Sequence, residues 1–275
     1  LRDKLLSAGL RDSLVKTSAG LDRVFEAQRT TLGCATAQPD PGCDVEVRVL
    51  YQVLRALPPE MTFAMILAGF ELASRDPRVV GFNLVQPEDD YTAMRDFSLH
   101  MRMIQTLRPL YPTVKVTLHA GELAPGLVPP EGLRFHIRES VRVAGASRIG
   151  HGVDIAQEED AVPLLQEMAR RNILVEIALT SNAGILGVRG KDHPLHLYMT
   201  YGVPVALSTD DEGVSRSDMN MEYKRAVEEQ GVTYADLKTM ARNSLRYSFA
   251  DEVTKTRLLR ELDAAFGSFE GVYGH

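Results

Sequence analysis

Short apolar runs alternate with longer amphipathic stretches along the middle of this chain, and no other feature constrains the fold as strongly. The runs that read as strands are 62–67, 79–85, 114–119, 148–151, 174–179 and 203–208. Helical patterns lie between them at 90–108, 135–144, 158–172 and 193–201. The runs are rich in Val, Ile and Leu with little alternation, which is typical of parallel strands that helices cover on both faces. The pattern predicts an α/β fold, with a (β/α)8 TIM-barrel type favoured over a doubly wound sheet.

The predicted barrel is short of strands. A barrel of this type closes with eight strands, and this sequence offers six candidates. Leu1 begins the chain inside a helical pattern and without a Met, so we expect the two missing strands to precede it. We predict one domain over 1–275, with a helical N-terminal region over 1–57 and helices alone over 220–275.

Charge and hydropathy exclude several classes of partner. The net charge is −6 and no dense Lys/Arg tract occurs, so nucleic acid is not an expected partner. No apolar stretch reaches the roughly 18 residues that span a bilayer, and the longest candidate, 61–72, is interrupted by Gly69 and Glu71. These features favour a small-molecule substrate, and they do not indicate an oligomeric state.

The only two cysteines, Cys34 and Cys43, flank a Pro/Gly-containing loop. They would either close as a surface disulfide or remain as two loop thiols. A disulfide implies an oxidising compartment, which would favour export to the periplasm or the exterior over the cytoplasm.

A histidine and a glutamate follow the strand candidate at 114–117, in Leu118-His119-Ala120-Gly121-Glu122. His119 is suited to bind a metal ion, and Gly121 lets the backbone turn tightly and approach a ligand closely. Glu122, one turn further, could pass protons between water and a leaving group. The alternative is a structural histidine at a strand end followed by a capping glutamate.

Two further strand ends carry similar groups. His151 stands between two glycines, where it would bind metal, hold a hydroxide or simply occupy a tight turn. Asp210 and Asp211 close an apolar run, and adjacent buried carboxylates require a cation or hydrogen-bond donors. One of them could bind metal while the other contacts substrate, although surface Asp-Asp pairs are also common.

The remaining polar positions indicate less. Ser181-Asn182 is a polar pair after the strand candidate at 174–179. His193 and His196 have the spacing of a metal pair, but Pro194 between them favours an ordinary helix start. The other histidines join no motif: His100, His136 and His275.

Taken in order, His-Ala-Gly-Glu, Gly-His-Gly, Ser-Asn and Ser-Thr-Asp-Asp each end a successive strand candidate. This set resembles the adenosine/AMP deaminase branch of the metal-dependent amidohydrolases over residues 60–250. The N-terminal helices, the loop between the cysteines and Phe70-Glu71-Leu72-Ala73 are most similar to the growth-factor-type adenosine deaminases and their bacterial relatives.

The resemblance implies an enzyme that hydrolyses adenosine, a purine nucleoside, to inosine and ammonia. Three residues would be catalytic: Glu122 protonates a purine ring nitrogen, His151 orients the attacking hydroxide, and Asp210 accepts a hydrogen bond from the attacking water. Asp211 and Gly121 would bind the purine. Adenine, AMP or another aminopurine is the alternative substrate, and a catalytically inert deaminase-like scaffold is the alternative to an enzyme.

The resemblance also implies a Zn²⁺ cofactor, bound by His119 and Asp210. Members of the family carry two more zinc ligands in a His-x-His pair, and this chain contains no His-x-His. We therefore expect the chain as given to bind zinc weakly and to be inactive unless that segment is supplied. Family members also often end the fourth strand with a glycine whose N–H meets the purine, whereas this chain has Leu84-Val85-Gln86-Pro87.

Overall fold

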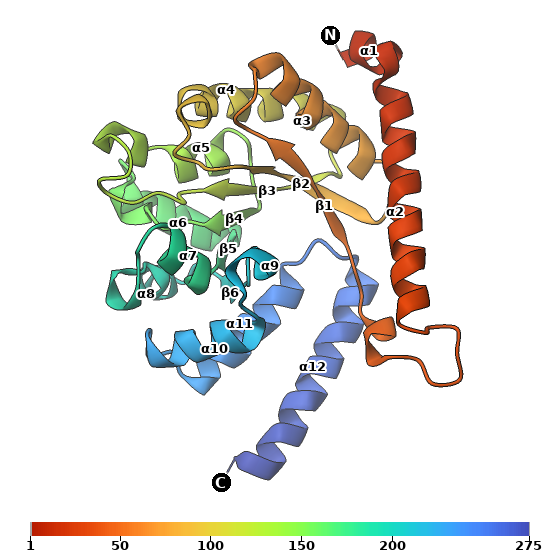
Figure 1. Cartoon of the computed structure of the whole chain (residues 1–275). Coiled ribbons are helices and arrows are strands. Elements are labelled where there is room, and N and C mark those ends of the chain that lie inside the picture. Colours follow the sequence, from red (N-terminus) through yellow and green to blue (C-terminus); the bar gives the residue numbers. More distant parts are fainter. Residues whose placement is uncertain (1, 275) are drawn as a thin grey trace.

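Six parallel strands form one sheet in the computed structural model, which describes residues 2–274. Each strand pairs with the next along the chain, and helices form the crossovers between them (Figure 1). This α/β arrangement is the one predicted from the sequence. In the described part of the chain β1 does not pair with β6, so the sheet is open between these two edges. The strands are β1 (Val49–Leu54), β2 (Val79–Val85), β3 (Lys115–Ala120), β4 (Arg148–His151), β5 (Leu174–Ile177) and β6 (Val205–Leu207).

Helices follow each strand and flank the sheet at both ends of the chain. The crossover helices are α3 (Pro59–Ala73), α4 (Tyr91–Leu107), α5 (His136–Arg142), α6 (Ala161–Arg171), α7 (Leu179–Ile185) and α8 (Leu195–Thr200). After β6 come α9 (Glu212–Ser215), α10 (Met219–Glu228), α11 (Tyr234–Arg246) and α12 (Glu252–Tyr273). The chain starts with α1 (Arg2–Leu5), a π turn (Leu6–Leu10) and α2 (Arg11–Thr31), which runs along the side of the molecule next to β1 (Figure 1).

Two sequence predictions near the N-terminal end of the sheet were wrong. Residues 62–67 are not a strand but lie within α3, and the strand of this region is β1, inside the N-terminal region over 1–57 that the sequence pattern assigned to helices. The apolar run of α3 is too long for a strand and begins with a proline at its first turn, where proline favours a helix. The N-terminal region over 1–57 is therefore helical only as far as Thr31, apart from a single 3₁₀ turn.

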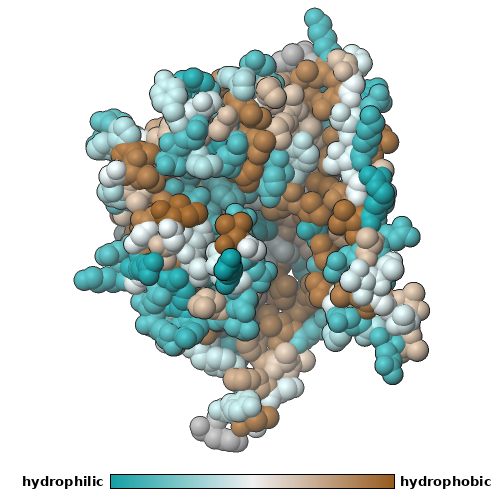
Figure 2. Space-filling view, viewed as in Figure 1, coloured by the Kyte–Doolittle hydropathy of each residue, from teal (hydrophilic) through white to brown (hydrophobic). Residues whose placement is uncertain are grey.

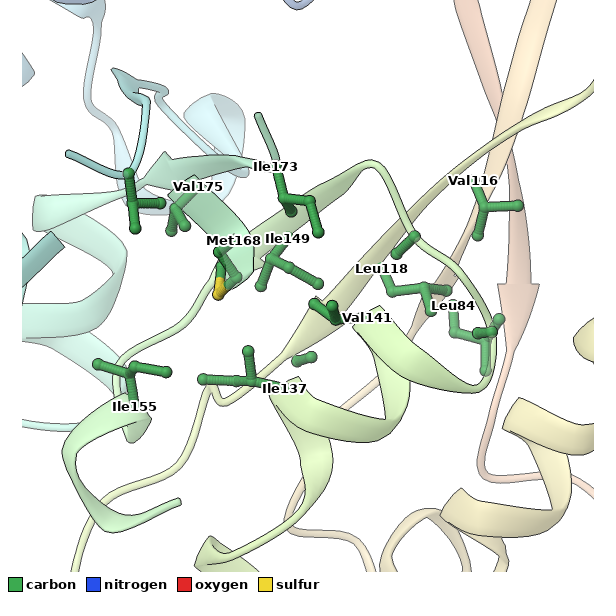
Figure 3. Close-up of a cluster of buried hydrophobic side chains, with 14 of the residues drawn as sticks. Leu84, Val116, Leu118, Ile137, Val141, Ile149, Ile155, Met168, Ile173 and Val175 are labelled. Atoms are coloured by element: carbon green, nitrogen blue, oxygen red, sulfur yellow. The ribbon is translucent and has the colours of Figure 1, made fainter. Parts of the chain in front are cut away.

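The two faces of the sheet differ in polarity. Apolar side chains of the strands pack against α5 and α6 in the core that Figure 3 shows, which includes Leu84, Val116, Leu118, Ile137, Val141, Ile149, Met168 and Val175. The opposite face carries polar side chains that line a cavity, among them Gln52, Asn83 and Glu176. Helices thus cover one face only. The expectation that helices cover both faces was therefore wrong, because polar residues such as Gln52, Asn83 and Glu176 lie between the core-facing apolar residues of their strands.

A disulfide joins Cys34 and Cys43 in the loop after α2, with their Cα atoms 5.6 Å apart. Apolar side chains are exposed around this loop, including Val24 in α2 and Val45 and Val47 before β1. Figure 2 shows apolar surface along this side of the molecule. Among the described residues, every helix is too short or too polar to cross a membrane.

Candidate active site

His119 lies near the carboxyl end of β3, where it faces Gly150 of β4 in the parallel register. Asn83 of β2 contacts it twice. Oδ1 of Asn83 accepts the backbone N–H of His119 at 3.0 Å, and Nδ2 of Asn83 lies 2.7 Å from Nδ1 of the imidazole. Burial, together with the neighbouring His151 and Arg55, holds the pKa of His119 well below the usual value for histidine.

The turn after β3 brings Glu122 beside these histidines. Gly121 has φ of +79°, and a Cβ on it would lie 2.4 Å from Oδ1 of Asp154, so only glycine fits this turn. One carboxylate oxygen of Glu122, Oε1, is buried without a hydrogen-bond partner and lies 3.6 Å from Nδ1 of His151. Burial raises the pKa of Glu122, which favours a protonated carboxyl able to act as an acid.

His151 ends β4 in the left-handed region of backbone conformation, with φ of +68°. This conformation is costly for a residue other than glycine, and residues held in it cluster at functional sites. Its Nδ1 lies 3.0 Å from Nδ2 of Asn182, and Oδ1 of Asn182 lies 3.1 Å from Nε2 of His193. Gly152 follows, and a Cβ there would lie 2.4 Å from the Tyr198 hydroxyl.

Asp210 and Asp211 follow β6 in the segment before α9. Asp210 is also in the left-handed region, with φ of +54°. Ligand atoms of His119, His151 and Asp210 all lie within 4.8 Å of one another. Both aspartates line a cavity of about 710 Å³ at the carboxyl ends of the strands, together with His119 and Glu122.

The structure thus brings together at one end of the sheet the residues that the sequence motifs singled out. His119, His151 and Asp210 form the compact group, and Glu122 and Asp211 reach the same region. Nitrogen and carboxylate donors at this spacing suit a transition-metal ion such as Zn²⁺. These residues lie close together because each follows or ends a strand, and the carboxyl ends of parallel strands share one edge of the sheet.

Other motif residues have different places. His193 and His196 do not pair: His193 contacts Asn182, whereas Nε2 of His196 lies 2.5 Å from the carbonyl oxygen of Gln230. Ser181 and Asn182 lie within α7, not at the end of β5. His275 lies outside the described residues.

A buried carboxylate behind the site was missed in the sequence. Glu88 accepts the backbone N–H groups of Gly121 at 2.9 Å and of Glu122 at 2.8 Å, and its Oε1 lies 2.5 Å from Nδ1 of His136. His136, which joins no sequence motif, therefore supports the site through Glu88. The signal that could have revealed Glu88 is its place in the loop after β2, the same position relative to a strand as Glu122 and Asp211.

Arg55 and Gln86 form hydrogen bonds between the carboxyl ends of neighbouring strands. Arg55 is fully buried after β1, and its guanidinium donates to the carbonyl oxygens of Leu84 and His119 at 2.7 and 2.9 Å. Gln86, at the position where the resembling family often has glycine, keeps a glycine-like φ of +85°. Its side-chain Oε1 accepts the backbone N–H of Ala56 at 2.8 Å, which helps to hold this unusual conformation.

The sequence of this chain is similar to those of known purine deaminases. A family model described as adenosine deaminase matches residues 14–265. An adenosine deaminase of Clostridium acetobutylicum is 32% identical over 54% of this chain and 42% of its own length. An adenine deaminase of Sinorhizobium medicae is 28% identical over 88% of this chain and 68% of its own length. The chain thus spans between about two fifths and two thirds of these relatives.

Solved structures of deaminases share the fold. The N6-methyl-AMP deaminase of Arabidopsis thaliana superimposes with a TM-score of 0.63, at 23% identity, over 82% of this chain and 63% of that chain. An amidohydrolase of Burkholderia ambifaria with bound Zn superimposes with a TM-score of 0.66, at 20% identity, over 82% of this chain and 59% of that chain. The shared fold is of the TIM-barrel type predicted from the sequence, and this chain spans about three fifths of each neighbour.

Proposed function

This chain belongs to the adenosine deaminase family, and we propose that it carries the active site of a zinc-dependent deaminase that converts adenosine to inosine and ammonia. The observation that supports this function best is the convergence of His119, His151 and Asp210 within 4.8 Å, with Glu122 beside them. Residues from three separate strand ends meet there, and a sheet that needed only packing would not require such a group.

The donor set supports a metal ion at this place. His119 offers an imidazole nitrogen and Asp210 a carboxylate oxygen, which are ligand types that Zn²⁺ accepts. When bound, Zn²⁺ would lower the pKa of a water molecule from about 15.7 to about 7 and so supply a nucleophile at neutral pH. Protein zinc sites of the catalytic type use three or more protein ligands, so two ligands predict weak binding.

The chain's own residues would handle the protons and the purine. Glu122, whose pKa burial raises, would protonate a ring nitrogen, and its carboxylate would then take a proton from the attacking water and pass it to the departing amine, which leaves as ammonia. His151 would orient the attacking oxygen by a hydrogen bond, and Asp210 would accept a hydrogen bond from it. Asp211 would contact the purine from the cavity wall, and Gly121 would let the backbone approach it.

The cavity lining favours an uncharged substrate over a nucleotide. Among the described lining residues there is no arginine or lysine, whereas six are acidic: Glu88, Asp89, Glu122, Glu176, Asp210 and Asp211. Arg189 and Lys191, in the segment between α7 and α8, do not line it. A phosphate group would meet repulsion here, so adenosine or adenine fits better than AMP. Adenine is the second candidate, because a relative that matches 88% of this chain is an adenine deaminase.

The disulfide between Cys34 and Cys43 supports a place for the protein outside the cytoplasm. Disulfides persist mainly in oxidising compartments such as the periplasm or the exterior. Export therefore remains our preferred localisation.

The function can be tested by measuring ammonia release from adenosine, adenine and AMP in the presence of zinc. We expect adenosine to be the best substrate, and Glu122→Gln to reduce the rate at least about 100-fold, as for the loss of a general acid. Glu131→Gln, an exposed change of the same type, is the matched control and should keep full activity. Full activity in Glu122→Gln would remove that residue from its role. If zinc-loaded protein released no ammonia from any of the three, the inert scaffold would be the better description.

A further inference from the structure

Both histidines of the site face a side-chain amide through the same ring nitrogen. Nδ1 of His119 lies 2.7 Å from Nδ2 of Asn83, and Nδ1 of His151 lies 3.0 Å from Nδ2 of Asn182. A side-chain amide nitrogen only donates hydrogen bonds, whereas an imidazole nitrogen can donate or accept. The location of the proton on each imidazole ring therefore depends on whether these side-chain amides can rotate by about 180° and exchange the positions of their oxygen and nitrogen atoms.

The side-chain amide of Asn83 cannot rotate by about 180° without losing a hydrogen bond. Its Oδ1 accepts the backbone N–H of His119 at 3.0 Å, and a backbone N–H is always a donor. Turning the amide would place its NH₂ group against that N–H. Nδ1 of His119 must therefore accept a hydrogen bond from Asn83, and a neutral ring then carries its proton on Nε2.

The amide of Asn182 is oriented by a longer chain of bonds. The backbone N–H of Leu195 donates to Nδ1 of His193 at 3.2 Å, so the proton of neutral His193 is on Nε2. The Nε2–H of His193 donates to Oδ1 of Asn182 at 3.1 Å, which leaves Nδ2 of Asn182 to donate to Nδ1 of His151. His193 is neutral at physiological pH, because burial lowers its pKa to about 4.

We propose that Asn83 and Asn182 are positioning residues that hold His119 and His151 with the proton on Nε2, and that Asn83 thereby weakens metal binding. This inference rests on the proposed function, because it concerns the same histidines. A histidine that binds a metal uses its unprotonated nitrogen and donates its other N–H to an acceptor. Asn83 presents a donor to Nδ1 of His119 instead. Binding of a metal ion through Nε2 of His119 would move the ring proton to Nδ1. The side-chain amide of Asn83 would then have to rotate and place its NH₂ group against the backbone N–H of His119.

The same arrangement suits His151 to a different task. Its Nδ1 lone pair is taken by Asn182, and its Nε2 carries a proton, so the neutral ring offers an N–H and no free lone pair. His151 thus acts as a hydrogen-bond donor to an oxygen of water or substrate, and not as a third metal ligand.

Nitrogen-15 NMR of the histidine rings tests the proton positions directly in the metal-free full chain. At about pH 8, above the usual histidine pKa of about 6.5, His119 and His151 should each show an unprotonated Nδ1 and a protonated Nε2. The signals are assigned with single His→Gln variants. In Asn182→Asp the new carboxylate only accepts, so the proton of His151 should move to Nδ1. A wild-type spectrum with Nδ1 of either ring protonated, or an unchanged His151 signal in Asn182→Asp, would overturn the proposal.

Zinc affinity, measured by competition with a chromophoric chelator, tests the consequence for metal binding. Asn83→Asp would accept both the backbone N–H and an Nδ1–H of His119, and should lower the zinc dissociation constant about 10- to 100-fold. Asn83→Ala removes the opposing donor without adding charge, and should also bind zinc more tightly than wild type. If only the Asp variant gained affinity, the added charge would explain the gain and the proposal would fail.

A matched control isolates the effect of a buried Asn→Asp change. Asn243 is also buried, and it donates to the carbonyl oxygen of Val205 away from the histidines. Asn243→Asp should leave the zinc affinity and the proton positions of both histidines unchanged. The NMR result does not depend on catalysis, so a chain that deaminates no purine would still confirm or overturn the role of the two amides.

Discussion

The Glu88 carboxylate holds the backbone of Glu122 in place, because its Oε2 accepts the Glu122 N–H at 2.8 Å. Its other oxygen accepts the N–H of Gly121 and lies beside His136. Burial alone would raise the pKa of Glu88, but the nearby charges of His136 and Arg55 and the Gly121 N–H lower it to about 2. A residue absent from every motif therefore determines the position of the proposed acid.

Replacing Glu88 by glutamine should destabilise the protein. The amide NH₂ would face a backbone N–H in place of an acceptor oxygen, and the charge opposite Arg55 would be lost. We expect the free energy of unfolding to fall by about 3–5 kcal/mol, as when one partner of a buried ion pair is removed. Urea denaturation at neutral pH measures this loss. Glu60→Gln, an exposed change, is the control and should alter stability little.

The same carboxylate predicts a loss of stability in acid. The pKa of Glu88 is lower in the folded protein than in the unfolded chain, so its contribution is fully present above about pH 4.5 and is lost as the pH falls toward about 2. In Glu88→Gln this part of the acid dependence should disappear. An acid denaturation profile of the same shape in both proteins would show that Glu88 does not carry it.

The sequence predicted the parts of the site that follow strands in recognisable phrases. His119, Glu122, His151 and Asp210 could be placed together because the carboxyl ends of parallel strands meet at one edge. Asn83 could not be found in this way, since it lies within a strand, and nothing in one sequence shows which face of β2 is polar. The strand β1 was missed because its residues also fit a helical pattern, and pairing with β2 decides the outcome.

We expect Glu158 to make stability depend on pH with the opposite sign to Glu88. Burial raises the pKa of Glu158 to about 7, although its Oε1 accepts the N–H groups of Ile137 and Arg138 at the start of α5. The folded protein thus binds a proton more tightly than the unfolded chain, so stability should fall by about 3 kcal/mol as the pH rises from about 4.5 to about 7.

Glutamine at position 158 should remove this dependence. Both backbone bonds use Oε1, and Oε2 is buried without a partner, so an amide can keep the bonds while losing the charge. We expect Glu158→Gln to gain about 1–3 kcal/mol over wild type at about pH 8 and little at about pH 4. Urea denaturation across this pH range measures the difference. A variant that was less stable than wild type at the higher pH would contradict the prediction.

The disulfide should stabilise the fold without affecting the site. Cys34 and Cys43 are nine positions apart, and closing a loop of about this length contributes about 2–3 kcal/mol. The double change of both cysteines to serine should lower stability by that amount and leave zinc affinity unchanged, because the loop does not line the cavity. A thiol reductant should destabilise the wild type and have no effect on the double variant. Equal responses to the reductant would indicate free thiols in the wild type.

Alanine at position 121 should disturb both the fold and the proposed acid. A Cβ there would lie 2.4 Å from Oδ1 of Asp154 and 2.8 Å from Cδ1 of Ile137, and the backbone has a positive φ. The combined cost of strain and overpacking is about 2–5 kcal/mol. Any shift of the turn moves Glu122, and a displacement of about 1 Å can lower a rate about 100-fold. Gly126→Ala is the matched control, because Gly126 also has a positive φ but no atom lies within 4 Å of its Cβ position. That variant should lose only the strain term, about 1–2 kcal/mol, and keep its rate of ammonia release. Equal losses of activity in the two variants would mean that backbone strain alone, and not the displacement of Glu122, explains the effect.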